Sequence, residues 1–317
     1  MKIFVTGHNG MVGISILNKI KNKYPTSETI TIDKKFLDLT HQNSVLTYLE
    51  NQKFDIIINC AAKVGGIYSN NTYRADFIYQ NLQIQNNLIH ASYLSGVKKL
   101  LFLGSSCIYP KFAEQPIKEE YLLTSPLEYT NEPYAIAKIA GIKMCESYYR
   151  QYGCNFISVM PTNLYGPNDN FHPLNSHVLP GLLHRFHLAK INNEPYVKIW
   201  GTGKAKREFM HVDDMADACL HVLENLEAKN LYNENISQIN IGSGFEISIS
   251  ELAQKISEVV NYKGEIQFDL TKPDGTLRKL LDCSRLNKLG YKPKIDINSG
   301  LKNTYNWYLN NQDKLKI

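Results

Sequence analysis

The fold is decided by the stretch KIFVTGHNGMVG, residues 2–13, in which a short apolar run leads into glycines spaced as GxxGxxG. The apolar run predicts a β-strand, and the glycines permit a tight turn at the start of a helix. Backbone N–H groups at a helix N-terminus attract the pyrophosphate of a dinucleotide. The strand–turn–helix context favours this interpretation over a glycine-rich turn without a ligand. The residues expected to line the turn are Gly7, His8, Asn9, Gly10, Met11, Val12 and Gly13.

Working outward from this stretch, short apolar runs alternate with helix-length segments through the first half of the chain. The runs predicted as strands are Ile3–Thr6, Thr29–Ile32, Ile56–Asn59, Leu100–Leu103 and Phe156–Met160. They lack period-2 alternation, so both faces of each strand should be buried, and the helical segments supply the crossovers. The prediction is an α/β fold with a doubly wound parallel (Rossmann) sheet.

Composition and charge narrow the function classes. The chain has 317 residues, of which 43% are hydrophobic and 21% charged, as expected of a soluble globular protein. Its net charge of +5 is not concentrated in any window, so a nucleic-acid partner is not expected. Six cysteines without a CxxC pair predict neither a zinc site nor a disulfide framework. The N-terminus leaves no room for a signal peptide and no 18-residue apolar run exists, so we expect a cytoplasmic protein without a membrane partner.

The end of the second predicted strand bears on the choice of dinucleotide. Asp33 stands where an acidic side chain usually accepts a hydrogen bond from the adenosine ribose, which is typical of NAD binding. Lys34 and Lys35 follow at once, and two ammonium groups could instead neutralise the 2′-phosphate of NADP. A strand-end aspartate with solvated lysines is the third interpretation, and the residues alone leave the three in competition.

Tyr134 is the only one of the 20 tyrosines with a lysine, Lys138, four residues on. The pair falls in a predicted helix, Tyr134–Tyr152, which puts both side chains on one face. A nearby ammonium favours the phenolate and makes the phenol a better proton donor and acceptor for interconverting a carbonyl and an alcohol. An isolated pair of this kind would more often be a surface contact, but here it follows a GxxGxxG turn.

A second candidate group ends the fourth predicted strand, at the sheet edge where ligands of doubly wound folds bind. Ser105 and Ser106 follow that strand, and a hydroxyl there can hydrogen-bond a substrate carbonyl beside Tyr134. Cys107 comes next, and a lone cysteine is by default a small buried hydrophobe.

The second half of the chain has a more irregular pattern. We expect a dinucleotide-binding domain over residues 1–165 and a smaller α/β substrate lobe over 166–317, with some segments crossing back to the sheet. Asn175 or Ser176 is placed to cap a helix, and Ser248 with Glu251 predicts a capping box opening a helix through Val260. On the first of these helices, the i, i+3 pair formed by His184 and His187 lacks a nearby carboxylate or third ligand, so no metal site is expected.

Several motifs together resemble the extended short-chain dehydrogenases/reductases. They are Gly7–Gly13, the run LGSSCIYP at 103–110, the run YAIAK at 134–138 and the run NLYGP at 163–167. Four more resemble, more narrowly, the GDP-L-fucose synthase family: AKVGGI at 62–67, DNFHP at 169–173, NSHV at 175–178 and KPDG at 272–275. The similarity spans Lys2 to about Asn310.

The resemblance implies reduction of a GDP-4-keto sugar at C4 with NADPH, after inversion at C3 and C5. Tyr134 would be the proton donor, Ser105 would polarise the C4 carbonyl, and Lys138 would hold the nicotinamide ribose. Cys107 and His177 would be the base and acid of epimerisation. From the residues alone, His177 is better explained as a helix-start histidine, and the matched NSH context reverses that interpretation.

Binding residues are also implied by the resemblance. Those expected to hold the GDP-sugar are Arg185, Trp200, Arg207 and Asp274, where each arginine could otherwise be a surface ion pair. Those expected to hold NADP, beside the glycine turn, are Asp33, Lys34, Lys35, Leu103, Gly104, Ser105, Ser106, Lys138, Pro161, Thr162, Asn163, Leu164 and His177. The family usually places an arginine where this chain has Asp33-Lys34-Lys35, so NAD stays open as the alternative.

The resulting expectation is a homodimeric, cytoplasmic GDP-4-keto-sugar reductase and 3,5-epimerase that supplies a sugar donor for capsule or lipopolysaccharide. Two alternatives stay open. One is a C4 reductase alone, acting on a related GDP-4-keto-hexose or GDP-4-keto-heptose. The other is a non-catalytic dinucleotide-binding sensor, which the joint presence of Ser105, Tyr134 and Lys138 disfavours.

Overall fold

The larger lobe is built on six parallel strands, and the computed structural model describes residues 1–173, 175–272, 274 and 276–315. The strands lie in the order β2-β1-β3-β4-β5-β9, and every neighbouring pair is parallel. Their bounds are β1 (Lys2–Thr6), β2 (Glu28–Ile30), β3 (Ile56–Asn59), β4 (Lys99–Leu103), β5 (Phe156–Pro161) and β9 (Ile239–Ile241). The predicted doubly wound parallel sheet is confirmed, although the second strand ends at Ile30 rather than Ile32.

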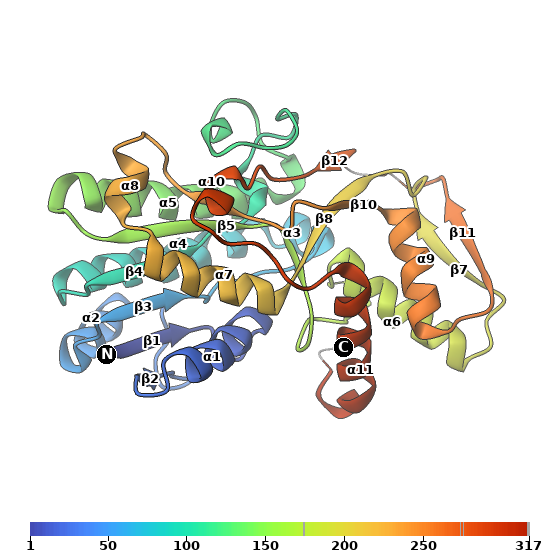
Figure 1. Ribbon diagram of the computed structural model, residues 1–317, viewed down its shortest axis with the longest axis horizontal. Coiled ribbons are helices and arrows are strands. Elements are labelled where there is room, and N and C mark those ends of the chain that lie inside the picture. The colour runs from blue at the N-terminus through green and yellow to red at the C-terminus, as the bar shows by residue number, and fades with distance from the viewer. Residues whose placement is uncertain (174, 273, 275, 316–317) are drawn as a thin grey trace.

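Helices cover both faces of this sheet (Figure 1). Alternate β1 residues explain why, because Ile3 and Val5 enter one apolar cluster while Phe4 enters the other. The first cluster lies under α1 (Met11–Lys23) and α7 (Val212–Asn225). The second lies under α2 (Gln42–Gln52), α4 (Arg74–Leu94) and α5 (Glu132–Tyr152). A strand buried on both faces therefore needs apolar side chains at every position, as the sequence shows.

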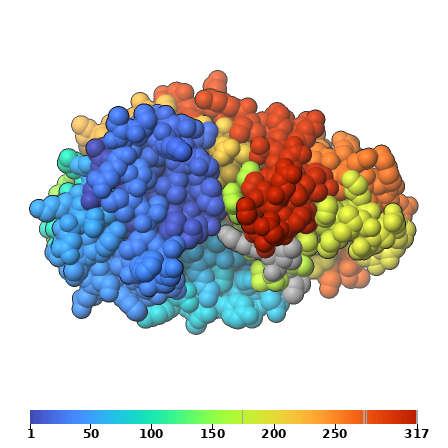
Figure 2. All heavy atoms as spheres, turned by 90° about the horizontal axis from the view of Figure 1, so that it is seen from below, coloured from blue at the N-terminus to red at the C-terminus, as the bar shows by residue number. Residues whose placement is uncertain are grey.

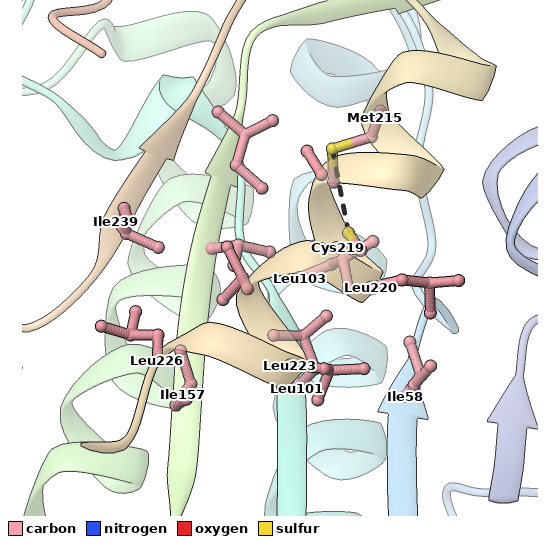
Figure 3. Packing of buried hydrophobic residues seen from close by; sticks show 14 of the residues in the cluster. Ile58, Leu101, Leu103, Ile157, Met215, Cys219, Leu220, Leu223, Leu226 and Ile239 are labelled. Carbon is pink, nitrogen blue, oxygen red and sulfur yellow. Dashed lines mark hydrogen bonds between the residues drawn. The ribbon is translucent and has the colours of Figure 1, made fainter. Parts of the chain in front are cut away.

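Figure 3 shows how closely α7 packs on the sheet. Its residues Met215, Cys219 and Leu223 belong to the same buried cluster as Leu101 of β4 and Ile157 of β5, and Leu223 lies beside Leu101. The strand β9 joins the same layer through Ile239, so the chain returns to the sheet after leaving it at β5. A strand from the second half of the chain therefore lies in the central sheet.

The predicted helix at Tyr134–Tyr152 is α5, which begins two residues earlier at Glu132. Pro133 lies in its first turn, where a missing backbone N–H costs nothing. Gly153 ends the helix in the left-handed conformation, with φ of 72°. Within the helix, a side chain at Gly141 would collide with the ring of Phe102, so this small residue lets α5 lie close to the sheet.

The smaller lobe has its own apolar cluster, which includes Phe171, Leu182, Phe186 and Leu252. Its central strand β8 pairs with β10, β12 and β6, while β11 pairs with β7. The strand bounds are β6 (Asn163–Tyr165), β7 (Tyr196–Trp200), β8 (Lys206–His211), β10 (Glu246–Ser248), β11 (Glu265–Asp269) and β12 (Arg278–Lys279).

Two helix starts in this lobe test the predicted caps. The helix α9 (Ile249–Val260) opens with the capping box of Ser248 and Glu251, as predicted. The helix α6 (Val178–Ile191) instead has His177 as its N-cap, in place of Asn175 or Ser176. The reason lies in tertiary contacts, because the Asn175 side chain accepts a hydrogen bond from Ser69, in the helix at Ile67–Thr72.

Shorter elements complete the chain. The remaining helices are α3 (Ile67–Thr72), α8 (Ala228–Tyr232), α10 (Ser284–Lys288) and α11 (Ile297–Asn310), with 3-10 turns η1 (Ser106–Ile108), η2 (Glu119–Tyr121), η3 (Tyr129–Asn131) and η4 (Gln312–Lys314). In the view of Figure 2, the N-terminal residues in blue and α11 in red lie on the two halves of the molecule. Within the described residues, none of the helices has the length and apolar character needed to cross a membrane.

Candidate functional site

The strand order reverses between β1 and β3, and the carboxyl ends of these parallel strands mark the crevice where ligands of such sheets bind. Gly7 lies in this crevice with φ of 67°, a conformation that favours glycine. A side chain at Gly7 would stand 2.7 Å from the backbone of Cys60, which follows β3. A side chain at Gly13 would collide with the carbonyl of Gly7. Close backbone packing therefore demands glycine at positions 7 and 13.

The turn leads into α1 through Gly10, an extended N-cap residue without a side chain to accept from the first helical N–H groups. These donors and the positive end of the helix dipole suit an anion such as a pyrophosphate. The predicted turn residues His8, Asn9, Met11 and Val12 lie in this same segment. The donor set fits a dinucleotide.

Asp33 is held against the glycine turn. It accepts a hydrogen bond from the amide of Asn9 at 2.9 Å, and its carboxylate lies 3.2 Å from Nε2 of His8. The hydrogen bond from Asn9 lowers the pKa of Asp33, with further contributions from His8 and Lys35. Lys34 is paired instead with Asp38 at 3.5 Å, and Lys35 lies over the ring of Phe36. Both lysines stay near the end of β2, while Asp33 is the group that faces the turn.

Ser105, Tyr134 and Lys138 are brought together at the carboxyl end of β4. The ammonium group of Lys138 is buried and donates a hydrogen bond of 2.8 Å to the carbonyl of Leu103, the last residue of that strand. The Ser105 side chain lies close enough to the Tyr134 phenol to affect its pKa. The three side chains thus form one continuous group across α5 and the loop after β4.

The protonation of this group differs from the sequence-based expectation. Burial raises the pKa of Tyr134 above its usual value, whereas the nearby Ser105 hydroxyl acts in the opposite direction. The ammonium group of Lys138 lies over the face of the Tyr134 ring, 5.8 Å from its centroid, and donates a hydrogen bond to the Leu103 carbonyl. Burial lowers the pKa of Lys138 to about 8. The phenol is therefore protonated near neutral pH, which is the form that a proton donor requires.

Cys107 is a free thiol that follows Ser105 in the turn η1, and its backbone N–H points to the Ser105 hydroxyl at 3.4 Å. Burial raises the pKa of the Cys107 thiol, and the charge of Lys279 is foremost among the groups that lower it. Cys107 and Lys279 line one cavity of about 50 Å³. Sequence reasoning missed Lys279, because the Arg278-Lys279 pair has no local pattern that separates it from ordinary surface charge.

His177 is presented at the start of α6 by a contact between the preceding loop and the first turn of α3. The backbone N–H of Gly66 donates to the carbonyl of Asn175 at 3.1 Å, and the Ser69 hydroxyl donates to the Asn175 side chain at 2.8 Å. A side chain at Gly66 would stand 2.7 Å from the carbonyl oxygen of Ser176. The motifs at 62–67 and 175–178 therefore form one structural unit. Although His177 is exposed, desolvation by the surrounding protein, followed by the charge of Lys279, lowers its pKa.

The other predicted cofactor residues lie along the carboxyl edge of β4 and β5. Gly104 continues the ladder by donating to the carbonyl of Val159 at 2.9 Å, and Ser106 is buried in η1. Pro161 ends β5, and the side chains of Thr162 and Asn163 both donate to the carbonyl of Glu208. Leu164 follows in β6. These residues form a continuous border from the central sheet to β8.

The four predicted sugar-nucleotide residues lie in the smaller lobe. Arg185 of α6 donates a hydrogen bond of 2.7 Å to the carbonyl of Lys198 in the strand β7. Trp200 is the last residue of β7, and 62% of its surface is exposed. Asp274 accepts from the backbone and hydroxyl of Thr202, and its charge faces Arg207 of β8. Pro273 and Gly275 of the KPDG motif lie outside the described residues. Arg207 pairs in register with Lys279, which links this group to the Cys107 cavity.

His184 and His187 are occupied by aromatic hydroxyls. Their Nδ1 atoms lie 2.7 Å and 3.1 Å from the hydroxyls of Tyr308 and Tyr305. These contacts tie α6 to α11, and a structural role accounts for both histidines.

Comparisons with known proteins point in one direction. Residues 3–242 match the family described as the NAD dependent epimerase/dehydratase family. The chain is 53% identical over 317 residues to GDP-L-fucose synthase of Escherichia coli strain K12, covering 99% of this chain and 98% of that protein.

Two solved structures are similar over nearly their whole length. One is a GDP-6-OMe-4-keto-L-xylo-heptose reductase from C. jejuni, with a TM-score of 0.92, 39% identity and coverage of 98% of this chain and 97% of that one. The other is a GDP-L-fucose synthetase from Naegleria fowleri bound to NADP, with a TM-score of 0.90, 28% identity and coverage of 100% and 96%.

Proposed function

Because this chain belongs to the NAD dependent epimerase/dehydratase family, we propose that it is an NADPH-dependent GDP-4-keto-sugar reductase that also epimerises C3 and C5, as a GDP-L-fucose synthase does. One observation carries the proposal: Ser105, Tyr134 and Lys138 meet at the carboxyl end of β4, directly beside the free thiol of Cys107. A ketone seated there would face a proton donor and a base at once.

The residues present fit a nicotinamide dinucleotide. The glycine turn at 7–13 and the start of α1 would hold its pyrophosphate, and Lys138 would hold the nicotinamide ribose. When bound, the reduced nicotinamide supplies the hydride that C4 receives. Lys34 and Lys35, in the turn that follows β2, support NADPH, as does the NADP named in the Naegleria fowleri structure. Asp33 is the feature that would favour NADH.

In the reduction, Tyr134 donates the proton to the C4 oxygen as C4 receives the hydride. Ser105 donates a hydrogen bond to the same oxygen and stabilises the charge that develops there. Lys138 stays at the Leu103 carbonyl, so its charge remains near the tyrosine as the proton leaves. The proton lost by Tyr134 must be replaced from solvent before the next turnover.

In the epimerisation, the Cys107 thiolate removes a proton from a carbon flanking the C4 ketone. The C–H bond breaks, an S–H bond forms, and the electron pair moves onto the C4 oxygen as an enolate. Ser105 and Tyr134 stabilise this enolate as they stabilise the alkoxide of reduction. His177 returns a proton to the opposite face of the carbon, which inverts it.

Recognition of the GDP-sugar falls to the smaller lobe. Arg185 and Arg207 suit the diphosphate because a guanidinium donates two parallel hydrogen bonds to phosphate oxygens. The exposed ring of Trp200 offers a flat face to a base or sugar, and Asp274 keeps the neighbouring turn in place through Thr202. We propose these four residues as the sugar-nucleotide site.

A reductase without epimerase activity is the second candidate, and the similarity to a heptose reductase favours weighing it. The deciding experiment follows NADPH oxidation at 340 nm with GDP-4-keto-6-deoxymannose and its heptose counterpart, and identifies the product sugar by NMR. Oxidation with inverted C3 and C5 supports the bifunctional enzyme. Oxidation with retained configuration selects the reductase, and no hydride transfer with either substrate overturns the proposal.

Three further expectations stay predictions: the division of the chain near residue 165, a cytoplasmic location, and a product destined for capsule or lipopolysaccharide. A homodimer is also proposed, with α4 and α5 as the contact. Exposed apolar side chains on these helices support it, among them Tyr79 (62% exposed) and Tyr152 (47%). Paired long helices are an economical way to cover such a face.

A further inference from the structure

The cavity beside Cys107 contains charge that the proposed mechanism does not use. It has a volume of about 50 Å³, enough for water, and its walls include Cys107, Lys279 and Glu128. The proposed reaction needs Cys107 as a thiolate, yet Cys107 is buried, with only 9% of the residue's surface exposed. A buried thiol in apolar surroundings stays protonated, so a nearby cation is required to change that.

Lys279 is held rigidly enough to be that cation. It lies on β12, which pairs with β8 so that Lys279 is opposite Arg207. The chain immediately after it is fixed by three backbone hydrogen bonds: Ile117 N–H to Leu280, Asp282 N–H to Ile117, and Leu281 N–H to the carboxylate of Glu208 at 3.0 Å. The base of the lysine side chain therefore has little freedom to move away from the cavity.

The charged and titratable groups around the pair come from four elements. Cys107 faces Lys279 of β12, and Lys138 and Tyr134 of α5. Lys279 in turn faces Cys107, Arg207 of β8 and Glu128, while His177 at the start of α6 senses its charge. Lys138 already donates a hydrogen bond to the Leu103 carbonyl, so Lys279 is the cation best placed to stabilise negative charge on the Cys107 sulfur.

We propose that Lys279 is a positioning residue for epimerisation: its ammonium group, facing the cavity shared with Cys107, stabilises the Cys107 thiolate that removes the proton beside the ketone. The role rests on the proposed epimerase activity. The step needs no oxidant or co-reactant, because the proton moves from carbon to sulfur and the electron pair moves to the C4 oxygen. The same charge makes the His177 imidazolium more acidic, which favours return of a proton to the sugar.

The first test needs no substrate. Wild-type enzyme, Lys279→Met and Lys279→Arg are treated with iodoacetamide from pH 6 to 10, and mass spectrometry follows alkylation of the Cys107 peptide alone. Lys279→Met should shift the alkylation profile to higher pH and slow the reaction at pH 7.5 by about tenfold or more, because each pKa unit changes the thiolate fraction tenfold. Lys279→Arg should restore most of the profile.

The matched control is Lys111→Met. Lys111 lines the same cavity but forms its ion pair with Glu128, at 3.7 Å. Its loss should leave the Cys107 profile within about twofold of wild type. Identical profiles for wild type and Lys279→Met would overturn the proposal. If Lys279→Met fails to fold, judged by circular dichroism, Lys279→Gln takes its place with the same expected shift.

The second test uses substrate and separates this proposal from the proposed function. In deuterated water without reduced cofactor, Lys279→Met should lose at least about tenfold in deuterium incorporation at C3 and C5, following the thiolate fraction. Reduction of an already epimerised ketone should fall far less. Equal losses in both reactions with an unchanged alkylation profile would assign Lys279 to substrate binding and overturn the proposal. Wild-type enzyme that reduces no GDP-4-keto sugar refutes the proposed function, while the alkylation profile still decides the Lys279–Cys107 pairing.

Discussion

The ammonium group of Lys138 donates a hydrogen bond of 2.8 Å to the carbonyl oxygen of Leu103, so the helix α5 is tied to the carboxyl end of β4. Ser105 follows Leu103 by two residues, and Tyr134 precedes Lys138 by about one helical turn. One buried contact therefore holds together the loop and the helix that carry the proposed catalytic groups.

Tyr134→Phe should remove the proton donor for C4. We expect kcat for reduction to fall by about 10²-fold or more, which is typical of losing a general acid. Stopped-flow absorbance of NADPH measures the rate. Cofactor affinity, measured by fluorescence titration, should change little because Lys138 remains in place. Near-normal turnover by the folded variant would rule Tyr134 out as the donor.

The cofactor preference should depend on the end of β2. Replacing both Lys34 and Lys35 by alanine should lower the ratio of kcat/KM for NADPH to that for NADH, since two positive charges near the 2′-phosphate are lost. Asp33→Ser should raise the ratio, because the carboxylate held by His8 and Asn9 repels a phosphate at that position. Ratios unchanged in both variants would mean that the 2′-phosphate is recognised elsewhere.

Proton exchange should separate the epimerase from a plain reductase. Wild-type enzyme in deuterated water, with the 4-keto substrate and no reduced cofactor, should place deuterium at C3 and C5. Cys107→Ser should suppress this exchange while sparing reduction of an epimerised substrate, because a serine hydroxyl is a far weaker base than a thiolate. NMR of the recovered sugar reports both positions.

His177→Asn should impair the return of the proton and therefore the inversion of configuration. The proton removed by Cys107 can still exchange with solvent, so deuterium incorporation with retained configuration is the expected signature. If wild-type enzyme incorporates no deuterium yet reduces the ketone well, epimerisation is refuted and Cys107 with His177 become pocket lining.

A buried carboxyl should make stability depend on pH. Glu119 of η2 is 4% exposed and accepts a hydrogen bond from the backbone of Asn240, and burial raises its pKa from 4.5 to about 7. The folded protein keeps this proton up to about pH 7, while the unfolded chain releases it near pH 4.5. The free energy of unfolding should therefore decrease as pH rises between these values, by at most about 3 kcal/mol from this group.

Glu119→Gln isolates that contribution, since the amide oxygen can still accept from Asn240 and carries no charge. Urea unfolding at pH 5 and pH 7.5 should give a smaller decrease for the variant than for wild type. The two proteins are compared because other buried carboxyls also titrate. Equal decreases would show that Glu119 is ionised in the folded protein throughout this range.

The proposed dimer should depend on the exposed apolar residues of α4 and α5. Replacing Tyr79 and Tyr152 together by glutamate should convert a dimer to a monomer in sedimentation velocity, because charge is costly to bury at an interface. Circular dichroism should remain unchanged, since both side chains are exposed in the single chain. A wild-type protein that sediments as a monomer at micromolar concentration would contradict the proposal.

The parts predicted well from sequence have a local physical cause. The β1–turn–α1 unit follows from an apolar run and glycines that close packing demands, and the capping box of Ser248 and Glu251 needs only neighbouring residues. Tyr134 and Lys138 share a helix face because the helical repeat puts them there. In each case the controlling contacts lie within a few residues of one another.

The tertiary structure alone decided which distant residues share the site. Lys279 reaches Cys107 only through the pairing of β12 with β8, and His177 became an N-cap because the first turn of α3 holds Asn175. The protonation of Tyr134 likewise depends on burial, which outweighed the lysine four residues on. Strand pairing, contacts between distant segments and desolvation depend on residues far apart in the chain. A local periodic pattern in the sequence therefore cannot predict them.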